Sequence, residues 1–176
     1  QSEIVDGLEK LRRFDRVVSI LGSARADKNS PQAQAAFALS KRFSEDGIAI
    51  MTGGGPGIME AANQAAFPSE LSIGLTIDLA DGEEATSYLN ELIDFRYFFV
   101  RKLMFVKKSS AFVYFPGGFG TLDELFTIAT LMQTQKTTKA PFILFDRDFW
   151  LPLMDWVKEK LTKNHYIEED EWNFIK

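Results

Sequence analysis

Glu124 is the first residue whose type and setting could perform chemistry, because it stands shortly after a glycine-rich turn, Pro116–Thr121. Such a turn is expected to open a helix, and the positive end of a helix dipole keeps a nearby carboxylate ionised. An ionised carboxylate stabilises a developing cation, as in glycoside cleavage, and it can orient or activate water. Cleavage of a bond to a sugar carbon is therefore one chemistry that Glu124 could support.

The same residues also fit a purely structural pattern. Thr121-Leu122-Asp123-Glu124 matches the capping box, T-x-x-E before an apolar run. In that pattern Thr121 caps the helix, and Glu124 reaches back to a backbone N–H group. Acidic residues are common in the first turn of helices. The sequence leaves both the catalytic and the capping interpretation of Glu124 open.

A stretch without acidic residues, Phe95–Leu122, carries the second candidate, Arg101. Arg101, Phe105 and Lys108 recur at helical spacing and so share one helix face. Most of the neighbouring side chains are apolar, and a buried guanidinium needs an anionic partner or ligand. We therefore interpret Arg101 as an anion-binding residue, whereas Lys107 and Lys108 are better explained as a solvated basic patch.

Glycine-rich turns follow three of the expected strands, at Gly22-Ser23, Gly53–Gly57 and Gly117–Gly120. Three such turns at one sheet edge suggest that the backbone approaches a ligand closely. No segment reads GxxxxGKS or GxxxxGKT, which excludes a P-loop, and Asp123 stands where the dinucleotide fingerprint GxGxxG needs its third glycine. Loop N–H groups and a helix dipole can still hold one phosphate, so a mononucleotide fits better than NAD.

Composition limits the chemistry further. The 176 residues include no cysteine and one histidine, which excludes disulfide scaffolds, thiol catalysis, Cys-based zinc sites and His-rich metal sites. The acidic residues show no metal-ligand spacing, so we expect no metal. A net charge of −5 argues against nucleic acid or anionic membranes as partners. No apolar run could span a bilayer and no signal peptide is visible, so we expect a soluble, cytoplasmic protein.

The elements that must position these residues alternate between short β-type runs and longer helical patterns, as in βα units around a parallel sheet. We expect Ser30 to cap the second helix and Asp148 the last one. The methionines, Met59 among them, are interpreted as core filling. Strands are expected near 17–21, 48–51, 73–77, 93–95, 111–115 and 142–145, and helices near 4–14, 31–44, 58–66, 97–108, 121–133 and 149–161.

These elements predict an α/β fold, an open parallel sheet with helices on both faces. The length fits one domain, which we place at residues 1–176 with its core at about 15–162. In this architecture ligands bind at the carboxyl ends of the strands.

Several motifs occur in the order typical of one protein family. Pro116–Glu124 matches PGGxGTxxE, the hallmark of the LOG ("lonely guy") family, and the sequence resembles these cytokinin riboside 5'-monophosphate phosphoribohydrolases and their bacterial relatives. The resemblance spans about residues 17–160. Further matches are Gly22–Arg25, Gly53–Asn63, Phe98–Lys102 and Gln133–Lys136.

The resemblance implies a Rossmann-like fold, a homodimer or higher homo-oligomer, and no cofactor. It also implies hydrolysis of the N-glycosidic bond of a nucleoside 5'-monophosphate, such as AMP or a cytokinin riboside monophosphate, to free base and ribose 5-phosphate. The family's catalytic arginine and glutamate fall on Arg101 and Glu124. Its phosphate loop falls on Gly117, Gly118, Gly120 and Thr121, and its other substrate contacts on Gly22, Ser23, Gly54, Gly55, Glu60 and Lys102.

Two segments depart from the family pattern, and two other functions stay open. Ala66–Glu70 replaces a glycine-rich stretch, and Asp78–Ser87 is unusually acidic; both could border the base pocket. Related Rossmann-like proteins carry molybdenum cofactor or bind nucleotides without turnover, which is the alternative function. A lysine decarboxylase is physically weak, because pyridoxal phosphate needs a Schiff-base lysine and an acidic partner, usually in a much larger fold.

Overall fold

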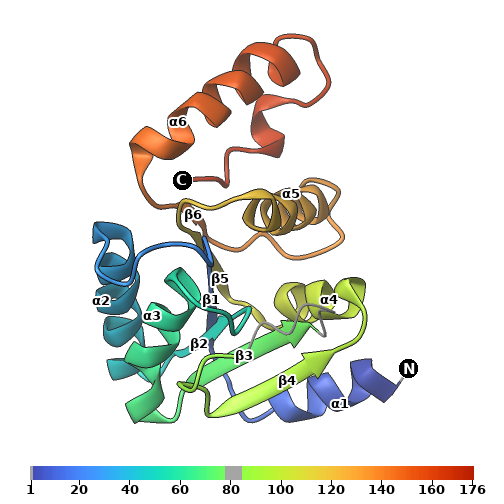
Figure 1. Cartoon of the computed structure of the whole chain (residues 1–176). Coiled ribbons are helices and arrows are strands. Elements are labelled where there is room, and N and C mark those ends of the chain that lie inside the picture. The colour runs from blue at the N-terminus through green and yellow to red at the C-terminus, as the bar shows by residue number, and fades with distance from the viewer. Residues whose placement is uncertain (1, 78–84) are drawn as a thin grey trace.

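The computed structural model describes residues 2–77 and 85–176, and within them six parallel strands form one sheet (Figure 1). The strand order is β4-β3-β2-β1-β5-β6. This confirms the expected α/β fold with an open parallel sheet. The strands are β1 (Val17–Leu21), β2 (Ala49–Thr52), β3 (Ser72–Ile77), β4 (Glu91–Phe95), β5 (Ala111–Tyr114) and β6 (Phe142–Leu144).

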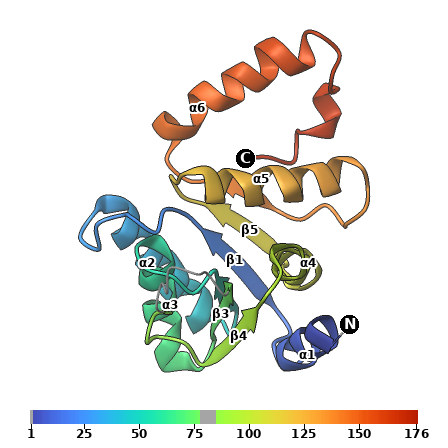
Figure 2. The same ribbon diagram turned by 45° about the vertical axis from the view of Figure 1, so that its right-hand side comes forward.

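Helices cover both faces of the sheet, as Figure 2 shows from a second direction. Alternate strand residues point to opposite faces, so the sheet buries two separate cores. The larger core contains side chains of α1 (Ser2–Leu11), α4 (Phe98–Lys108), α5 (Phe119–Gln133) and α6 (Arg147–Trp156). The smaller core contains side chains of α2 (Pro31–Glu45) and α3 (Ile58–Ala66).

The direction of strand addition changes next to β1. From β1 the chain adds β2, β3 and β4 on one side, and α4 then returns it to the other side of β1, where β5 and β6 follow. β1 and β5 are neighbours, but the loop after β1 leads toward β2 and the loop after β5 leads toward β6, in opposite directions along the sheet. In open α/β sheets this reversal opens a crevice at the carboxyl ends, where ligands bind.

Local signals place most element boundaries. Ser30 caps α2 as expected, since its hydroxyl accepts the Ala33 N–H at 3.2 Å, and Pro31 occupies the first helical position. The expectation that Asp148 caps the last helix is wrong. Asp146 is the N-cap residue, because its backbone carbonyl accepts the Trp150 N–H and the helix begins at Arg147.

The chain after α6 continues as a π-helix, Val157–Thr162, and returns to the sheet through a 3-10 turn, Glu169–Glu171. Ile175 then pairs with Phe142 at the edge of β6. In the described part of the chain, no helix is long and apolar enough to cross a membrane.

Candidate active site

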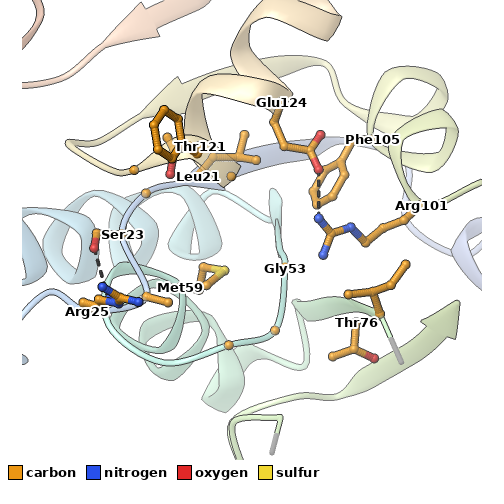
Figure 3. Close-up of a pocket in the computed structure, with 18 of the residues that line it drawn as sticks. Leu21, Ser23, Arg25, Gly53, Met59, Thr76, Arg101, Phe105, Thr121 and Glu124 are labelled. Atoms are coloured by element: carbon orange, nitrogen blue, oxygen red, sulfur yellow. Dashed lines mark hydrogen bonds and ion pairs between the residues drawn. The ribbon is translucent and has the colours of Figure 1, made fainter. Parts of the chain in front are cut away.

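A cavity of about 510 Å³ opens at the carboxyl edge of the sheet, where three glycine-rich loops meet α4 (Figure 3). Gly22 from the β1–α2 loop, Gly55 from the β2–α3 loop and Gly118 from the β5–α5 loop all line it. The three turns thus lie at one edge of the sheet, as the parallel strand pattern predicted.

Close backbone contacts hold the loop after β1 against both the turn before α5 and the start of α3. Ser23 donates its N–H to the carbonyl of Pro116 at 3.0 Å, and its own carbonyl accepts the N–H of Ile58 at 3.1 Å. Gly57 has φ +69°, and a Cβ on it would lie 2.4 Å from the Ser23 carbonyl oxygen. A Cβ on Gly22 would lie 2.8 Å from the side chain of Ile58. Glycine is therefore required where α3 begins against the loop after β1.

A buried polar network fixes the turn after β2. The Thr52 hydroxyl accepts the N–H of Gly54 at 2.9 Å and donates to the amide oxygen of Asn63. The Asn63 amide nitrogen donates to the Ser72 hydroxyl at 2.9 Å. These side chains are fully buried. Asn63 thereby connects α3 to the end of β2 and to β3, a role that the motif match alone did not predict.

Arg101 on α4 and Glu124 on α5 form an ion pair at one end of the cavity (Figure 3). Arg101 Nη2 donates to Glu124 Oε1 at 3.1 Å, and the two side chains are 17% and 4% exposed. The guanidinium also lies 5.2 Å from the centroid of the Phe98 ring, a cation–π distance. The anionic partner that a buried Arg101 requires is therefore Glu124.

Burial raises the pKa of Glu124, and the positive charges of Arg101 and Lys102 oppose that shift. The pair is not fully satisfied. Oε2 of Glu124 and Nε of Arg101 are buried and have no hydrogen-bond partner among the described residues. A buried polar atom without a partner is costly, and both residues line the cavity that a ligand or water would occupy.

The capping-box interpretation of Glu124 is wrong. α5 begins at Phe119, and its N-cap is Gly118, which makes no side-chain cap hydrogen bond. The glycine turn leads straight into the helix, so Thr121 already lies inside the first turn and Glu124 points to Arg101. The first N–H groups of a helix have no intrahelical partner, and those of Phe119, Gly120 and Thr121 form no hydrogen bond within the described residues.

Nine of the twelve expected site residues line this cavity. They are Gly22, Ser23, Gly54, Gly55, Arg101, Gly118, Gly120, Thr121 and Glu124. Glu60, Lys102 and Gly117 do not. Lys102 lies beside the cavity, where its ammonium pairs with Asp123 at 2.6 Å and ties α4 to α5. Gly117 lies directly against Thr121: a Cβ on Gly117 would lie 2.1 Å from the Thr121 hydroxyl oxygen.

Other lining residues were not expected, among them Arg25, Met59, Thr76 and Phe105. The interpretation of Met59 as core filling is wrong: its side chain lies over the turn after β2, 2.9 Å from where a Cβ on Gly53 or on Gly55 would be. The helical spacing from Arg101 to Phe105 could have indicated Phe105. The acidic segment Asp78–Ser87 was expected near the base pocket, and its residues 78–84 lie outside the described part.

The chain is similar to known proteins both in sequence and in fold. The model of a family described as "Possible lysine decarboxylase" matches residues 59–176, more than half of the chain. The cytokinin riboside 5'-monophosphate phosphoribohydrolase LOG of Oryza sativa subsp. japonica is 29% identical over 170 residues, which cover 95% of this chain and 69% of that protein. The chain belongs to the LOG family.

Solved structures share the fold of this LOG family member. The X-ray structure of TM1055, a structural genomics target, has a TM-score of 0.65 and 20% identity, covering 92% of this chain and 89% of that one. The molybdenum cofactor binding protein of Rippkaea orientalis has a TM-score of 0.60 and 21% identity, covering 81% and 85%. At these identities the likeness concerns the fold alone.

Proposed function

We propose that this LOG family protein hydrolyses the N-glycosidic bond of nucleoside 5'-monophosphates, releasing free base and ribose 5-phosphate. One observation carries the proposal. Glu124 is a buried carboxylate that Arg101 holds by one oxygen, while the other oxygen lacks a partner within the described residues and the side chain lines the cavity. A carboxylate held in this way suits a reaction that develops positive charge on a sugar.

The start of α5 supports binding of the 5'-phosphate. The N–H groups of Phe119, Gly120 and Thr121 have no partner in the described chain, and the positive end of the helix dipole lies with them. The cavity volume falls within the range of about 300–1,000 Å³ that small-molecule sites occupy. Binding energy from the phosphate, which does not react, can then hold the sugar against Glu124.

In the proposed reaction the bond from the ribose C1′ to the base nitrogen breaks, and its electron pair leaves with the base. Positive charge develops on the sugar and is stabilised by the Glu124 carboxylate. Water forms the new bond to C1′, Glu124 Oε2 accepts the proton that this water loses, and the proton then passes to the departing base. Arg101 keeps the carboxylate oriented and stabilises its ionised form.

The test is base release from nucleotides. The purified protein is incubated with AMP, other nucleoside 5'-monophosphates and N6-substituted AMP, and the products are separated by chromatography. We expect equimolar base and ribose 5-phosphate from at least one nucleotide and none from adenosine. Absence of base release from every nucleotide would overturn the hydrolase proposal.

The alternative is a protein that binds a nucleotide or molybdenum cofactor without turnover, as the name of the Rippkaea orientalis protein suggests for that neighbour. Tight binding of AMP with no base release would favour this alternative. Lysine decarboxylation has little support here: no described residue lining the cavity is a lysine, and residues 78–84 contain none either. A Schiff base to pyridoxal phosphate requires one.

We also propose that residues 1–176 act as one LOG-like nucleotide-binding domain that forms a homodimer. The helices that carry the ion pair support this, because Phe98 and Phe99 on α4 and Phe126 on α5 are exposed aromatic side chains. Exposed apolar side chains that gather in one patch are typical of interaction surfaces. Light scattering after size-exclusion chromatography should give twice the mass of 19.9 kDa. A monomer at all concentrations would contradict the dimer.

A further inference from the structure

The described lining of the cavity contains two cationic side chains, Arg25 and Arg101. They differ in what surrounds them. Arg101 is largely buried and paired with Glu124 at 3.1 Å, so its charge is already balanced. Arg25 is exposed and forms no ion pair within the described residues. Residues 78–84 add no further arginine or lysine to the chain.

The backbone of Arg25 is held close to the glycine turn before α5. Its N–H donates to the Ser23 hydroxyl at 3.1 Å, and the N–H of Ser23 donates to the Pro116 carbonyl at 3.0 Å. Pro116 directly precedes the turn that leads into α5. Figure 3 shows Ser23 and Arg25 on the side of the cavity opposite the Arg101–Glu124 pair. The backbone of Arg25 is therefore held at the rim of the cavity, and its side chain is exposed.

The balance of charges in the cavity indicates which group of a ligand Arg25 can bind. A phosphate monoester carries a charge of about −1.5 to −2 at neutral pH. A helix N-terminus contributes only about half a positive charge, and the charge of Arg101 is offset by Glu124. A phosphate held by the first N–H groups of α5 would therefore keep at least one unbalanced negative charge. Within the described lining, Arg25 is the remaining cation that can balance it.

We propose that the Arg25 guanidinium pairs with the phosphate of the ligand at the start of α5, and that this contact selects phosphorylated over unphosphorylated ligands. The inference rests on the proposed function for the identity of the ligand. Arg25 would act as a specificity-determining residue, distant from the glycosidic bond. A guanidinium is suited to this because its fork of N–H donors matches two phosphate oxygens.

The test compares Arg25→Gln, Arg25→Lys and a matched control, Arg42→Gln. Arg42 is an exposed arginine near the end of α2 that does not line the cavity, so the control removes the same charge elsewhere. Calorimetry measures the binding of ribose 5-phosphate and of ribose to each protein. Kinetics measure KM and kcat for AMP at low and high salt.

We expect Arg25→Gln to weaken ribose 5-phosphate binding by about ten- to a hundredfold, the range for loss of a charged hydrogen-bond partner, with ribose binding unchanged. KM for AMP should rise by a similar factor, while kcat stays within about threefold and the salt dependence of KM becomes weaker. Arg25→Lys should recover part of the affinity, and Arg42→Gln should match the parent protein.

Several results would overturn the role of Arg25. They are unchanged ribose 5-phosphate affinity in Arg25→Gln, an equal loss for ribose, and a parent protein that does not distinguish the two ligands. Failure of the proposed hydrolase activity gives a different pattern. A parent protein that binds ribose 5-phosphate but releases no base refutes hydrolysis. The ribose 5-phosphate affinities of the parent protein and of Arg25→Gln still decide whether Arg25 binds the phosphate.

Discussion

Arg101 Nη2 and Glu124 Oε1 lie 3.1 Å apart and join α4 to α5 in a largely buried ion pair. Each partner keeps one buried polar atom without a hydrogen bond in the described structure, Nε of Arg101 and Oε2 of Glu124. A pair that served stability alone would gain from satisfying these atoms, because an unsatisfied buried group costs about 1–3 kcal/mol. The lack of a partner at these two atoms therefore indicates a role for the pair beyond stability.

Replacing Glu124 with Gln separates the structural role of the pair from its catalytic role. The amide oxygen can still accept a hydrogen bond from Arg101, so we expect destabilisation of about 1–3 kcal/mol. Turnover of AMP should fall by about a hundredfold or more, because an amide neither balances a developing cation nor accepts a proton from water. Chemical denaturation measures the first effect, and base release well below the melting temperature measures the second.

Asp123→Asn is the matched control for this variant. Asp123 is the neighbouring carboxylate, pairs with Lys102 at the surface and does not line the cavity. Such exposed pairs contribute about 0–1 kcal/mol, so this variant should keep near-parental stability and activity. Base release by Glu124→Gln at near the parental rate would exclude Glu124 as the catalytic carboxylate.

The pH dependence of activity and of stability should run in opposite directions. Burial raises the pKa of Glu124, and the ionised form is the one that the reaction needs, so kcat should decrease as the pH falls through this pKa. The folded state then binds the proton more tightly than the unfolded state. The contribution of Glu124 to stability therefore rises as the pH falls through the same range and is complete below the unfolded pKa.

NMR of the labelled Glu124 carboxyl carbon tests the cause of the shift. Arg101 and Lys102 both lower this pKa against the effect of burial, and Arg101 has the larger effect. Arg101→Gln should therefore move the titration to higher pH, and Lys102→Gln should move it in the same direction by a smaller amount. A titration that moves to lower pH in either variant would contradict this account of the electrostatics.

The sequence predicted the sheet edge and the ion pair's members because those depend on local or strictly repeated signals. Parallel strands end at one edge, so glycine turns after β1, β2 and β5 had to meet there. An arginine on an apolar helix needs an anion, and Glu124 is that anion. The individual glycine turns and the two candidate residues are each found from a few neighbouring residues, whereas the contact between Arg101 and Glu124 depends on the packing of α4 against α5.

The errors arose where distant segments decide the local structure. T-x-x-E is a valid capping pattern, but α5 already begins at Phe119, so Thr121 is not its N-cap. Glu124 instead pairs with Arg101, which is 23 positions away in the sequence. Methionine is a residue type that commonly fills protein cores. That Met59 lines the cavity follows only from the position of its side chain beside Gly53 and Gly55. Arg25 gave no local signal of its own beyond its place after Gly22-Ser23.

Glycines 117 and 120 should respond differently to alanine. A Cβ on Gly117 would lie 2.1 Å from the Thr121 hydroxyl oxygen, whereas a Cβ on Gly120 has no protein atom within 4 Å. Gly117→Ala should therefore destabilise the protein by about 1–3 kcal/mol through overpacking and displace the start of α5. Gly120→Ala should leave the free energy of unfolding nearly unchanged.

KM for AMP should nevertheless rise in both glycine variants. The open space beside Gly120 is where we place the phosphate, so its methyl group should raise KM for AMP by about tenfold or more while the fold stays intact. Thermal denaturation and AMP kinetics on the two variants give the comparison. A Gly120→Ala protein with the parental KM would remove the phosphate from this position.

Asn63 should be as important for the site as for stability, although it does not line the cavity. Asn63→Ala removes the acceptor of the Thr52 hydroxyl and a donor to Ser72, whose own hydroxyl still donates to the Tyr88 carbonyl. We expect a loss of about 2–4 kcal/mol in urea denaturation from the unsatisfied polar group and lost packing. The Thr52 hydroxyl also accepts the Gly54 N–H, so the turn after β2 loses its support and KM for AMP should rise. Gln64→Ala, at the exposed neighbouring position of α3, should change stability by less than about 0.5 kcal/mol and leave KM unaltered. Equal effects of the two variants on KM would show that the network does not position the turn, because only Asn63 is connected to Gly54 through Thr52.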